Sequence, residues 1–255
     1  MRLPRPLAVS SSLLASQLRG WRGTNAFRPA QKQPEQLLEL YEYEGCPYCR
    51  LVREALTELD LDARIYPCPR GGSRFRPRVK EMGGKRLFPY LVDPNTGVKM
   101  YESADIVAYL RKTYAGRDTR PGLLDRPIKV ATSMLASGLR AGRGLRARPS
   151  KPAAQPLELF SFESSPFSRL VREALCELEL PYTLRNTGKG HWKDLGPPSV
   201  RDRLHQSPKD TGRNRKVLVE RTGRVQLPYL IDPNTGAEMY ESADILRYLE
   251  ATYAA

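Results

Sequence analysis

The stretch that decides the fold is Gly45–Leu61, "GCPYCRLVREALTELDL", and the chain contains it twice. The second version, "SSPFSRLVREALCELEL", runs from Ser164 to Leu180 and aligns with the first without a gap. A later block also repeats, because "PYLVDPNTGVKMYESADIVAYLRKTYA" at 89–115 returns as "PYLIDPNTGAEMYESADILRYLEATYA" at 228–254. The 255-residue chain is therefore a tandem duplication. Each copy has about 80–100 residues, which is within the size range of a small domain.

Each copy predicts the same order of secondary-structure elements. A short alternating strand at 37–43, or at 157–162, leads into the tetrapeptide, and a helix with apolar residues at spacings of three and four follows. A second strand is expected at 63–67 and at 181–185. A hairpin at 88–102 and a helix that begins at Ser103 complete the first copy. The order β-α-β-(loop or helix)-β-β-α predicts an α/β unit with a four-stranded mixed sheet.

The segments outside the repeated blocks have a different composition. Residues 1–36 are rich in arginine and serine, with no acid before Glu35. This is typical of an organelle transit peptide, and a disordered basic tail is the alternative. We expect the first domain at 37–116, a connecting helix and a basic linker at 117–155, and the second domain at 156–255. The connecting helix, near Leu123–Leu139, is expected to pack on the first domain rather than to lie on a membrane surface.

Charge and cysteine content exclude several classes of protein. The net charge is +14, but the excess lies at the N-terminus and in loops rather than on one face with interleaved aromatics, so we expect no nucleic-acid partner. No apolar run approaches the roughly 18–20 residues of a transmembrane helix. The four cysteines do not form a secreted disulfide framework. Only one C-x-x-C is present, and both histidines lie in the second copy, so we expect no zinc site.

Cys46 and Cys49 form the only local cysteine motif. A strand, a turn and a C-x-x-C at the start of a helix place Cys46 where unpaired N–H groups and the helix dipole stabilise a thiolate. Arg50 and Arg53 are expected to add positive charge nearby, and Pro47 suits the first helical turn. Cys46 is therefore the predicted nucleophile, and Cys49, one turn further on, is the thiol expected to resolve a mixed disulfide.

These residues carry a resemblance to known families. "CPYC", followed downstream by a proline between apolar residues, resembles the glutaredoxin branch of the thioredoxin superfamily. "FPYLVDP" and "MYESADIVAYL" are similar to the N-terminal domain of glutathione S-transferases, and the tandem layout resembles plant and algal plastid proteins. The resemblance implies two thioredoxin-like domains in tandem. It also implies a chloroplast location, with the mitochondrion as the alternative.

The resemblance further implies a glutathione site in each copy. Pro89 matches the family's cis-proline, and Phe88 before it offers backbone groups to the cysteinyl part of glutathione. Glu102 and Ser103 match the pair that holds the γ-glutamyl end, and the N–H groups of a helix that starts at Ser103 suit a carboxylate. The residues predicted to bind glutathione are Tyr48, Phe88, Pro89, Glu102 and Ser103 in the first copy, and Ser165, Leu227, Pro228, Glu241 and Ser242 in the second.

The second copy lacks the thiols. Ser165 and Ser168 stand in their places and cannot exchange disulfides, so we expect this copy to be non-catalytic. The alternative is that Ser165 resembles the serine with which some transferase classes activate the glutathione thiol. Cys176 and Cys68 are expected to be inert, although Cys68 could be a third redox thiol. The basic insert at 185–216 is interpreted as a long exposed loop.

These observations favour a glutathione-linked disulfide reductase or deglutathionylase in which Cys46 is the nucleophile. Its substrates would be disulfides or glutathionylated proteins. A second hypothesis, which the resemblance permits, is a module in which glutathione and a cysteine ligate a 2Fe–2S cluster. Conjugation of glutathione through Ser165 and a scaffold without turnover are the remaining alternatives. Conjugation is disfavoured because no all-helical second domain follows either copy to form a pocket for the electrophile.

Overall fold

The structure is a computed structural model that describes residues 4–118, 125–196 and 210–255. The first half of the chain (4–118) contains α1 Arg5–Leu18, β1 Leu38–Glu42, α2 Pro47–Glu58, β2 Ala63–Pro67, α3 Arg76–Gly83, β3 Tyr90–Asp93, β4 Val98–Met100 and α4 Ser103–Ala115. The second half (125–255) contains α5 Asp125–Gly138, β5 Leu157–Ser161, α6 Pro166–Glu177, β6 Tyr182–Asn186, the 3-10 turn η1 Trp192–Asp194, α8 Arg213–Thr222, β7 Tyr229–Asp232, β8 Ala237–Met239 and α9 Ser242–Tyr253. The predicted α/β order is confirmed in both halves.

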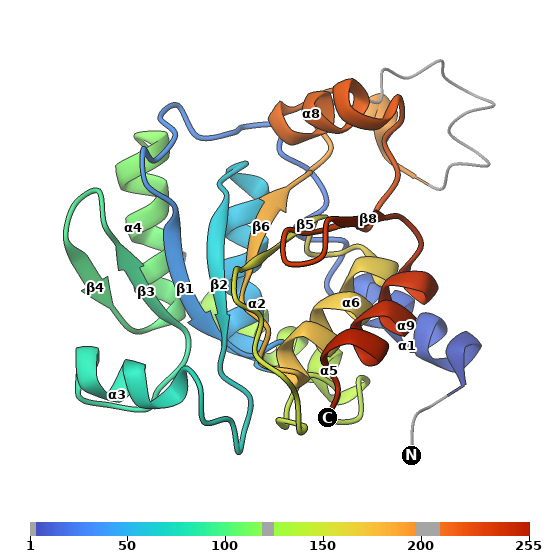
Figure 1. Cartoon of the computed structure of the whole chain (residues 1–255). Helices are drawn as coiled ribbons and strands as arrows, with labels where there is room; N and C mark the ends of the chain where they lie inside the picture. The colour runs from blue at the N-terminus through green and yellow to red at the C-terminus, as the bar shows by residue number, and fades with distance from the viewer. Residues whose placement is uncertain (1–3, 119–124, 197–209) are drawn as a thin grey trace.

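The strands of both halves form one continuous mixed sheet, in the order β4-β3-β1-β2-β6-β5-β7-β8. Within each half, the first two strands are parallel and the hairpin is antiparallel to them. The halves join where β2 and β6 pair antiparallel, with Ile65 opposite Tyr182, so that β6 runs beside β2 in the middle of the sheet (Figure 1). We expected two separate four-stranded sheets. The pairing satisfies the backbone groups that β2 and β6 would otherwise leave open as edge strands.

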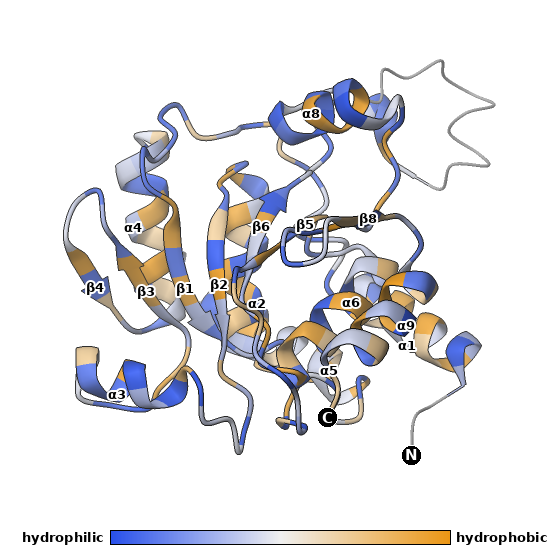
Figure 2. Cartoon of the chain, viewed as in Figure 1, coloured by the Kyte–Doolittle hydropathy of each residue, from blue (hydrophilic) through white to orange (hydrophobic). Residues whose placement is uncertain are grey.

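A single hydrophobic core continues across this junction. In the first half, Leu40 of β1 and Ile65 of β2 lie under Leu56 of α2. Leu159 of β5 and Leu175 of α6 are the corresponding residues in the second half and belong to the same cluster. The hydrophobic stretches of the central strands are visible in Figure 2. Because apolar surface is buried across the junction, we expect the two halves to be stable only together.

The N-terminal segment is folded, which corrects one expectation. Residues 1–36 were predicted to be a transit peptide or a disordered tail, but residues 5–18 form helix α1, whose buried face includes Ala8, Ser12, Ala15 and Ser16. The disordered alternative is therefore wrong, because small side chains at helical spacing let α1 pack closely against α6. A role of the segment as an organelle address stays a prediction.

The helices α1 and α5 belong to the duplicated unit and exchange places. "RPLAVSSSLLASQLRGWRG" at 5–23 aligns without a gap with "RPIKVATSMLASGLRAGRG" at 126–144. Yet α1 packs on α6 of the second half, and α5 packs on α2 of the first. Matching hydrogen bonds hold them, since Ser12 Oγ donates to the Pro166 carbonyl (2.8 Å) and Ser133 Oγ donates to the Pro47 carbonyl (2.7 Å). The expected packing of the connecting helix on the first domain is confirmed, and the exchange was not foreseen.

A glycine follows each exchanged helix and allows the chain there to lie close to the opposite half of the molecule. Gly23 and Gly144 have φ values of +71° and +64°, and an added Cβ would lie 2.8 Å from Glu163 and 2.7 Å from Glu44, respectively. The Gly144 carbonyl also accepts a hydrogen bond from the Gly45 N–H at 3.1 Å, directly before Cys46. Only glycine combines this backbone conformation with so close an approach.

The insert of the second half contains more structure than expected. Residues 185–216 were interpreted as one long loop, but η1 lies within that range and α8 begins at Arg213. Residues 197–209 of the insert lie outside the described residues. Asn214 of α8 donates to Asp62 Oδ1 (2.7 Å) and to the Asn186 carbonyl (2.8 Å), which fixes the helix to both halves. The expectation failed because polar side chains and one buried apolar residue, Leu218, hold this helix, and the sequence shows no apolar stripe there.

Candidate functional site

Cys46 caps the N-terminus of α2. It has an extended backbone conformation (φ −78°, ψ 122°), and its Sγ accepts a hydrogen bond from the Cys49 N–H at 3.3 Å. Pro47 follows at the first helical position, where its missing N–H costs nothing. The predicted placement of the first thiol at a helix start is therefore confirmed. The cap uses the sulfur as an acceptor of N–H groups, which favours its thiolate form.

The two thiols have opposite environments. Burial alone would raise the pKa of Cys46, but hydrogen bonds from the Cys49 thiol, from backbone N–H groups of Cys49 and Tyr48 and from the Tyr43 hydroxyl lower it to about 7. Burial and the neighbouring Cys46 raise the pKa of Cys49 well above its ordinary value. Cys46 is thus the thiol that is ionised near neutral pH, and Cys49 retains its proton.

The arginines that follow the motif do not act as expected. Arg50 and Arg53 were predicted to add positive charge beside Cys46, but both are buried and turned toward carboxylates between the two halves. Arg53 Nε contacts Glu163 at 2.9 Å, and Arg50 Nη1 lies 3.8 Å from the same carboxylate. The Cys46 thiolate is therefore stabilised mainly by hydrogen bonds rather than by these charges.

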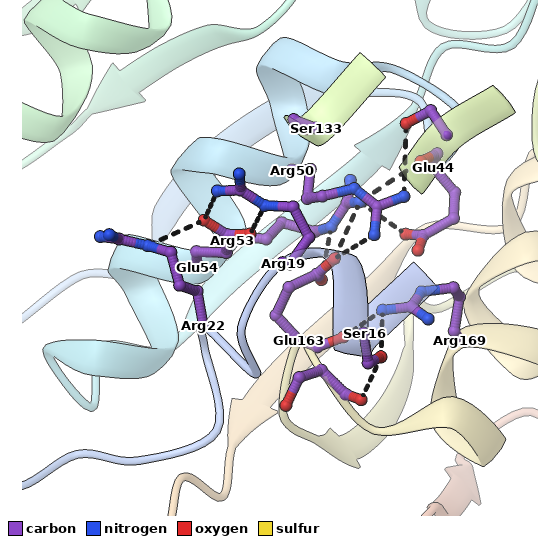
Figure 3. A network of polar contacts seen from close by, with 12 residues as sticks. Ser16, Arg19, Arg22, Glu44, Arg50, Arg53, Glu54, Ser133, Glu163 and Arg169 are labelled. Atoms are coloured by element: carbon purple, nitrogen blue, oxygen red, sulfur yellow. Dashed lines mark hydrogen bonds and ion pairs between the residues drawn. The ribbon is translucent and has the colours of Figure 1, made fainter. Parts of the chain in front are cut away.

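Four buried side chains form an alternating ion cluster behind the site. Arg53 contacts Glu44 (3.1 Å) and Glu163 (2.9 Å), and Arg172 contacts the same two carboxylates at 3.1 and 3.0 Å. Figure 3 shows the part of this network around Arg53 and Glu163. Glu42 also binds Arg53. Because Glu44 lies two residues before Cys46, the cluster anchors the loop that carries this cysteine.

Glu42 is a third carboxylate beside this cluster, in addition to Glu44 and Glu163. Burial raises its pKa to about 8, with Arg53 opposing and the nearby Glu44 and Cys46 adding to the rise. The burial of Glu42 outweighs its contact with Arg53, so this carboxyl retains its proton at neutral pH. The counterpart of Glu42 in the second half is Ser161.

Tyr43 is a site residue that the sequence reasoning missed. It directly follows β1, its hydroxyl bonds Cys46, and its ring lies edge-on to Phe88 with centroids 6.0 Å apart. It therefore joins the C-x-x-C loop to the residue before Pro89. Its counterpart in the second half is Phe162, which has no hydroxyl. The sequence shows this difference between the copies in addition to the loss of both thiols. Tyr43 could therefore have been identified from the sequence as a candidate site residue.

Removing the Tyr43 hydroxyl tests this contact. In Tyr43→Phe, the pKa of Cys46 is expected to rise toward its ordinary value, because the thiolate loses one donor. Alkylation of Cys46 by iodoacetamide below pH 7 should slow about fivefold. The matched control is Tyr66→Phe, which removes a hydroxyl from a tyrosine that stacks on Tyr41 and not on the site. An unchanged alkylation profile in Tyr43→Phe, or the same shift in both variants, would contradict the assignment.

The predicted cis-proline geometry is present in both halves. The Phe88–Pro89 and Leu227–Pro228 bonds are both cis. Phe88 lies under the Arg76 guanidinium, 4.7 Å from the ring centroid, which fixes this side of the site. Phe88, directly before Pro89, thus lies beside Tyr43, whose hydroxyl bonds Cys46, as expected for residues that would contact one ligand. Their binding of glutathione stays a prediction.

The residue before α4 has a strained backbone conformation, and no side chain caps the start of this helix. Glu102 has φ +68°, and its counterpart Glu241 has φ +63°, which is costly for a residue with a side chain. Neither side chain caps its helix, so the first N–H groups of α4 and α9 remain for another acceptor. Such strain held at the same place in both halves suggests a binding role for the backbone at Ser103 and Ser242.

Helix α5 approaches this end of α4. Arg126 Nη2 lies 3.8 Å from Glu102 on the surface, and a cavity of about 60 Å³ between α2, α4 and α5 is lined by Ser103 and Val130 among others. Cys46 is not part of its wall. Because α5 belongs to the second repeat, the predicted γ-glutamyl site of the first half is flanked by side chains from both repeats.

The second half retains the backbone frame of the site without its two thiols. Ser165 caps α6 as Cys46 caps α2, and its Oγ accepts from the Ser168 N–H at 3.3 Å. Serine is a favoured N-cap, so the helix start survives the loss of sulfur. Within the described residues, the buried Ser168 hydroxyl has no hydrogen-bond partner, which is unfavourable and indicates a position shaped for a thiol. Tyr48 and its counterpart Phe167 are both exposed at the surface.

The remaining cysteines are buried and free. Burial raises the pKa of Cys68 and of Cys176 well above the ordinary value, so neither is nucleophilic at neutral pH. In the described ranges, no group of three or more His, Cys, Asp or Glu side chains could hold a metal ion. The 2Fe–2S hypothesis therefore gains no support. The helices of this part of the chain are also too short or too polar to cross a bilayer.

Comparison with known proteins identifies a family for this chain. The family model "Glutathione S-transferase, N-terminal domain" matches residues 40–118 and 159–255, which together are more than half of the chain. A comparison with curated proteins found no match. The solved structure of the Bombyx mori glutathione transferase BmGSTD1 is 27% identical over 34% of this chain and 40% of its own, with a TM-score of 0.31. That of the trimeric Leishmania glutathione transferase TDR1 is 13% identical over 86% of this chain and 68% of its own, with a TM-score of 0.28. The chain, matched in both halves, belongs to the glutathione S-transferase N-terminal domain family.

Proposed function

We propose that the protein is a glutathione-linked thiol–disulfide oxidoreductase in which Cys46 is the nucleophile. The observation that carries this proposal is the Cys46 cap, where several hydrogen-bond donors lower the pKa of the thiol to about 7. A thiol with a pKa near ambient pH combines a large thiolate fraction with good nucleophilicity. The match to a glutathione-related family makes glutathione the natural co-substrate.

The proposed reaction is an exchange in two steps. The Cys46 thiolate attacks the glutathione sulfur of a mixed disulfide, a Cys46–glutathione disulfide forms, and the substrate thiol leaves and takes up a proton. The thiolate of a second glutathione molecule then attacks the glutathione sulfur of that disulfide. Oxidised glutathione leaves, and the Cys46 thiolate is restored. In an alternative second step, Cys49 loses its proton and attacks Cys46, which closes an intramolecular disulfide and releases glutathione.

Burial of the nucleophile indicates the kind of substrate. Cys46 is only 2% exposed, so a folded protein disulfide cannot reach it without movement of the covering segments. The disulfide that joins glutathione to a flexible segment is less enclosed by other atoms, so it can reach Cys46 where a disulfide in a folded domain cannot. The proposal therefore favours glutathionylated peptides, flexible protein segments and small disulfides over disulfides within folded domains.

The second half is proposed to be non-catalytic. Ser165 Oγ already accepts a hydrogen bond as the cap of α6, and a hydroxyl in this place does not ionise near neutral pH. The retained cis-proline and the strained Glu241 leave the binding frame in place, so this half is suited to hold glutathione without turning it over. We find no observation that favours conjugation through Ser165 over this role.

A coupled assay of the full chain tests the proposal. Reduction of a glutathionylated peptide by glutathione should be catalysed, with oxidised glutathione followed through glutathione reductase. The rate should rise with pH through about 7 and level off above it, because the ionised form of Cys46 is the attacking species. Absence of turnover with this substrate and with a small disulfide would refute the function, and an inflection near pH 9 would refute the activation of Cys46.

A further inference from the structure

Eight of the sixteen large apolar side chains that are exposed within the described residues lie on the two exchanged helices or directly after them. In α1, Leu7, Leu14 and Leu18 are 55%, 50% and 46% exposed. At the matching positions in α5 and directly after it, Ile128, Leu135 and Leu139 are 61%, 61% and 41% exposed. Spacings of seven and four residues place each set of three on one side of its helix. We call these six residues the α1–α5 apolar face. The water-exposed surface of a protein rarely carries a cluster of this many large apolar side chains unless the cluster binds a partner.

The two sets lie on one surface because α1 and α5 are antiparallel neighbours. Arg19, after the end of α1, donates to the Lys129 carbonyl near the start of α5 (2.9 Å). Arg140, after the end of α5, donates to the Ala8 carbonyl near the start of α1 (2.9 Å). Because the two contacts join matching positions of the repeat, α1 and α5 are related by an approximate two-fold axis. Ser11 and Thr132 accept hydrogen bonds from Arg140 and Arg19, and each adjoins the apolar set of its own helix at helical spacing. Each apolar set therefore borders the α1–α5 contact, and the two continue one another across it.

The surroundings of this face are basic. Arg5 and Arg126 are exposed at the starts of the two helices, and Arg22 and Arg143 are half-buried beyond their ends. No acidic residue precedes Glu35 in the sequence. Two acidic side chains lie at the rim, because Glu102 approaches Arg126 at 3.8 Å and Glu58 approaches Arg22 at 3.6 Å. The chain as a whole carries a net charge of +14. An apolar stripe framed by arginines matches a surface with a negative outer layer and an apolar interior.

We propose that the α1–α5 apolar face is a docking surface for a membrane that contains anionic lipids. The helices would lie in the plane of the interface, with the six apolar side chains below the headgroups and the arginines at headgroup level. A second copy of the chain is a poorer occupant. In a two-fold contact, arginine-rich helix ends would meet a surface on which α1 offers no carboxylate. The exchange of helices makes this face rigid, since each helix is fixed to the opposite half.

Vesicle co-sedimentation of the full chain tests the docking surface. We expect the protein to bind vesicles of phosphatidylcholine and phosphatidylglycerol, to bind pure phosphatidylcholine at least tenfold more weakly, and to be released by added salt. In Leu14→Glu/Leu135→Glu, binding to the anionic vesicles should fall about tenfold or more. The matched control is Leu195→Glu/Val217→Glu, which adds the same charge at exposed apolar positions away from this face and should fall much less.

Three outcomes would overturn the proposal. The first is equal binding of the wild-type chain to both vesicle types, or no binding to either, and these measurements need no variant. The second is an equal loss in the two double variants, with circular dichroism confirming that both are folded. The third is a concentration-dependent dimer in light scattering that Leu14→Glu/Leu135→Glu dissociates, because a second copy would then be the occupant of the face.

Discussion

Replacing Cys46 with serine is expected to abolish turnover of a glutathionylated peptide, with a loss of at least about three orders of magnitude. A serine hydroxyl in this cap remains un-ionised near neutral pH and cannot form a disulfide, so both proposed steps fail. The fold should survive, because Ser165 already caps the equivalent helix with the same backbone contact, at 3.3 Å. The measurement is the coupled glutathione reductase assay, with circular dichroism to confirm folding.

Two matched cysteine variants serve as controls for this prediction. Cys49→Ser should retain turnover of the glutathionylated peptide, because a second glutathione can resolve the Cys46 disulfide without it. Cys68→Ser should leave the rate unchanged, since burial keeps that thiol protonated. Activity of Cys46→Ser close to wild type, or a loss in Cys68→Ser as large as in Cys46→Ser, would contradict the assignment of the nucleophile.

Removing Arg53 is expected to destabilise the whole chain by about 3–5 kcal/mol. Arg53 is fully buried, and Arg53→Ala would remove the ion-pair partner of Glu42. Glu44 and Glu163 would keep Arg172, and Glu163 would also keep the more distant Arg50 at 3.8 Å. Buried carboxylates without a partner are costly, and the Arg172 contacts cannot satisfy all three. Since the ion cluster spans both halves, one cooperative loss of stability is expected rather than unfolding of the first half alone.

Urea unfolding followed by circular dichroism and by tryptophan fluorescence measures this effect. The matched control is Arg221→Ala, which breaks an exposed pair with Glu238 and should cost at most about 1 kcal/mol. A double-mutant cycle with Glu163→Gln would show whether the two residues are coupled. A loss in Arg53→Ala no larger than in Arg221→Ala would contradict the view that the cluster holds the halves together.

Local features of the fold could be read from the sequence. The strand at 63–67, the hairpin and the cap at Cys46 depend on short motifs, and the cis bond at Pro89 was implied by the family resemblance. Each of them is confirmed. Because each of these features occurs in both repeats, the prediction for one repeat could be compared with the prediction for the other. The glutathione-binding roles assigned through the family resemblance stay predictions.

Long-range features could not be read in the same way. The pairing of β2 with β6 and the ion cluster bring together residues more than a hundred positions apart, and no local pattern encodes them. The arginine at position 53 was therefore placed near Cys46, although it turns toward Glu163. The folded N-terminus did have a signal, because 5–23 repeats 126–144, but the arginine- and serine-rich composition of a transit peptide concealed it.

The most direct test of the central claim is to find where glutathione attaches. Cys49→Ser prevents intramolecular resolution, so reaction of this variant with oxidised glutathione at pH 7 should trap a stable mixed disulfide that peptide mass spectrometry can locate. The account predicts that the adduct forms at Cys46, and that Tyr43→Phe in the same background slows its formation. An adduct at Cys68 or Cys176 instead, or no adduct at all, would contradict it.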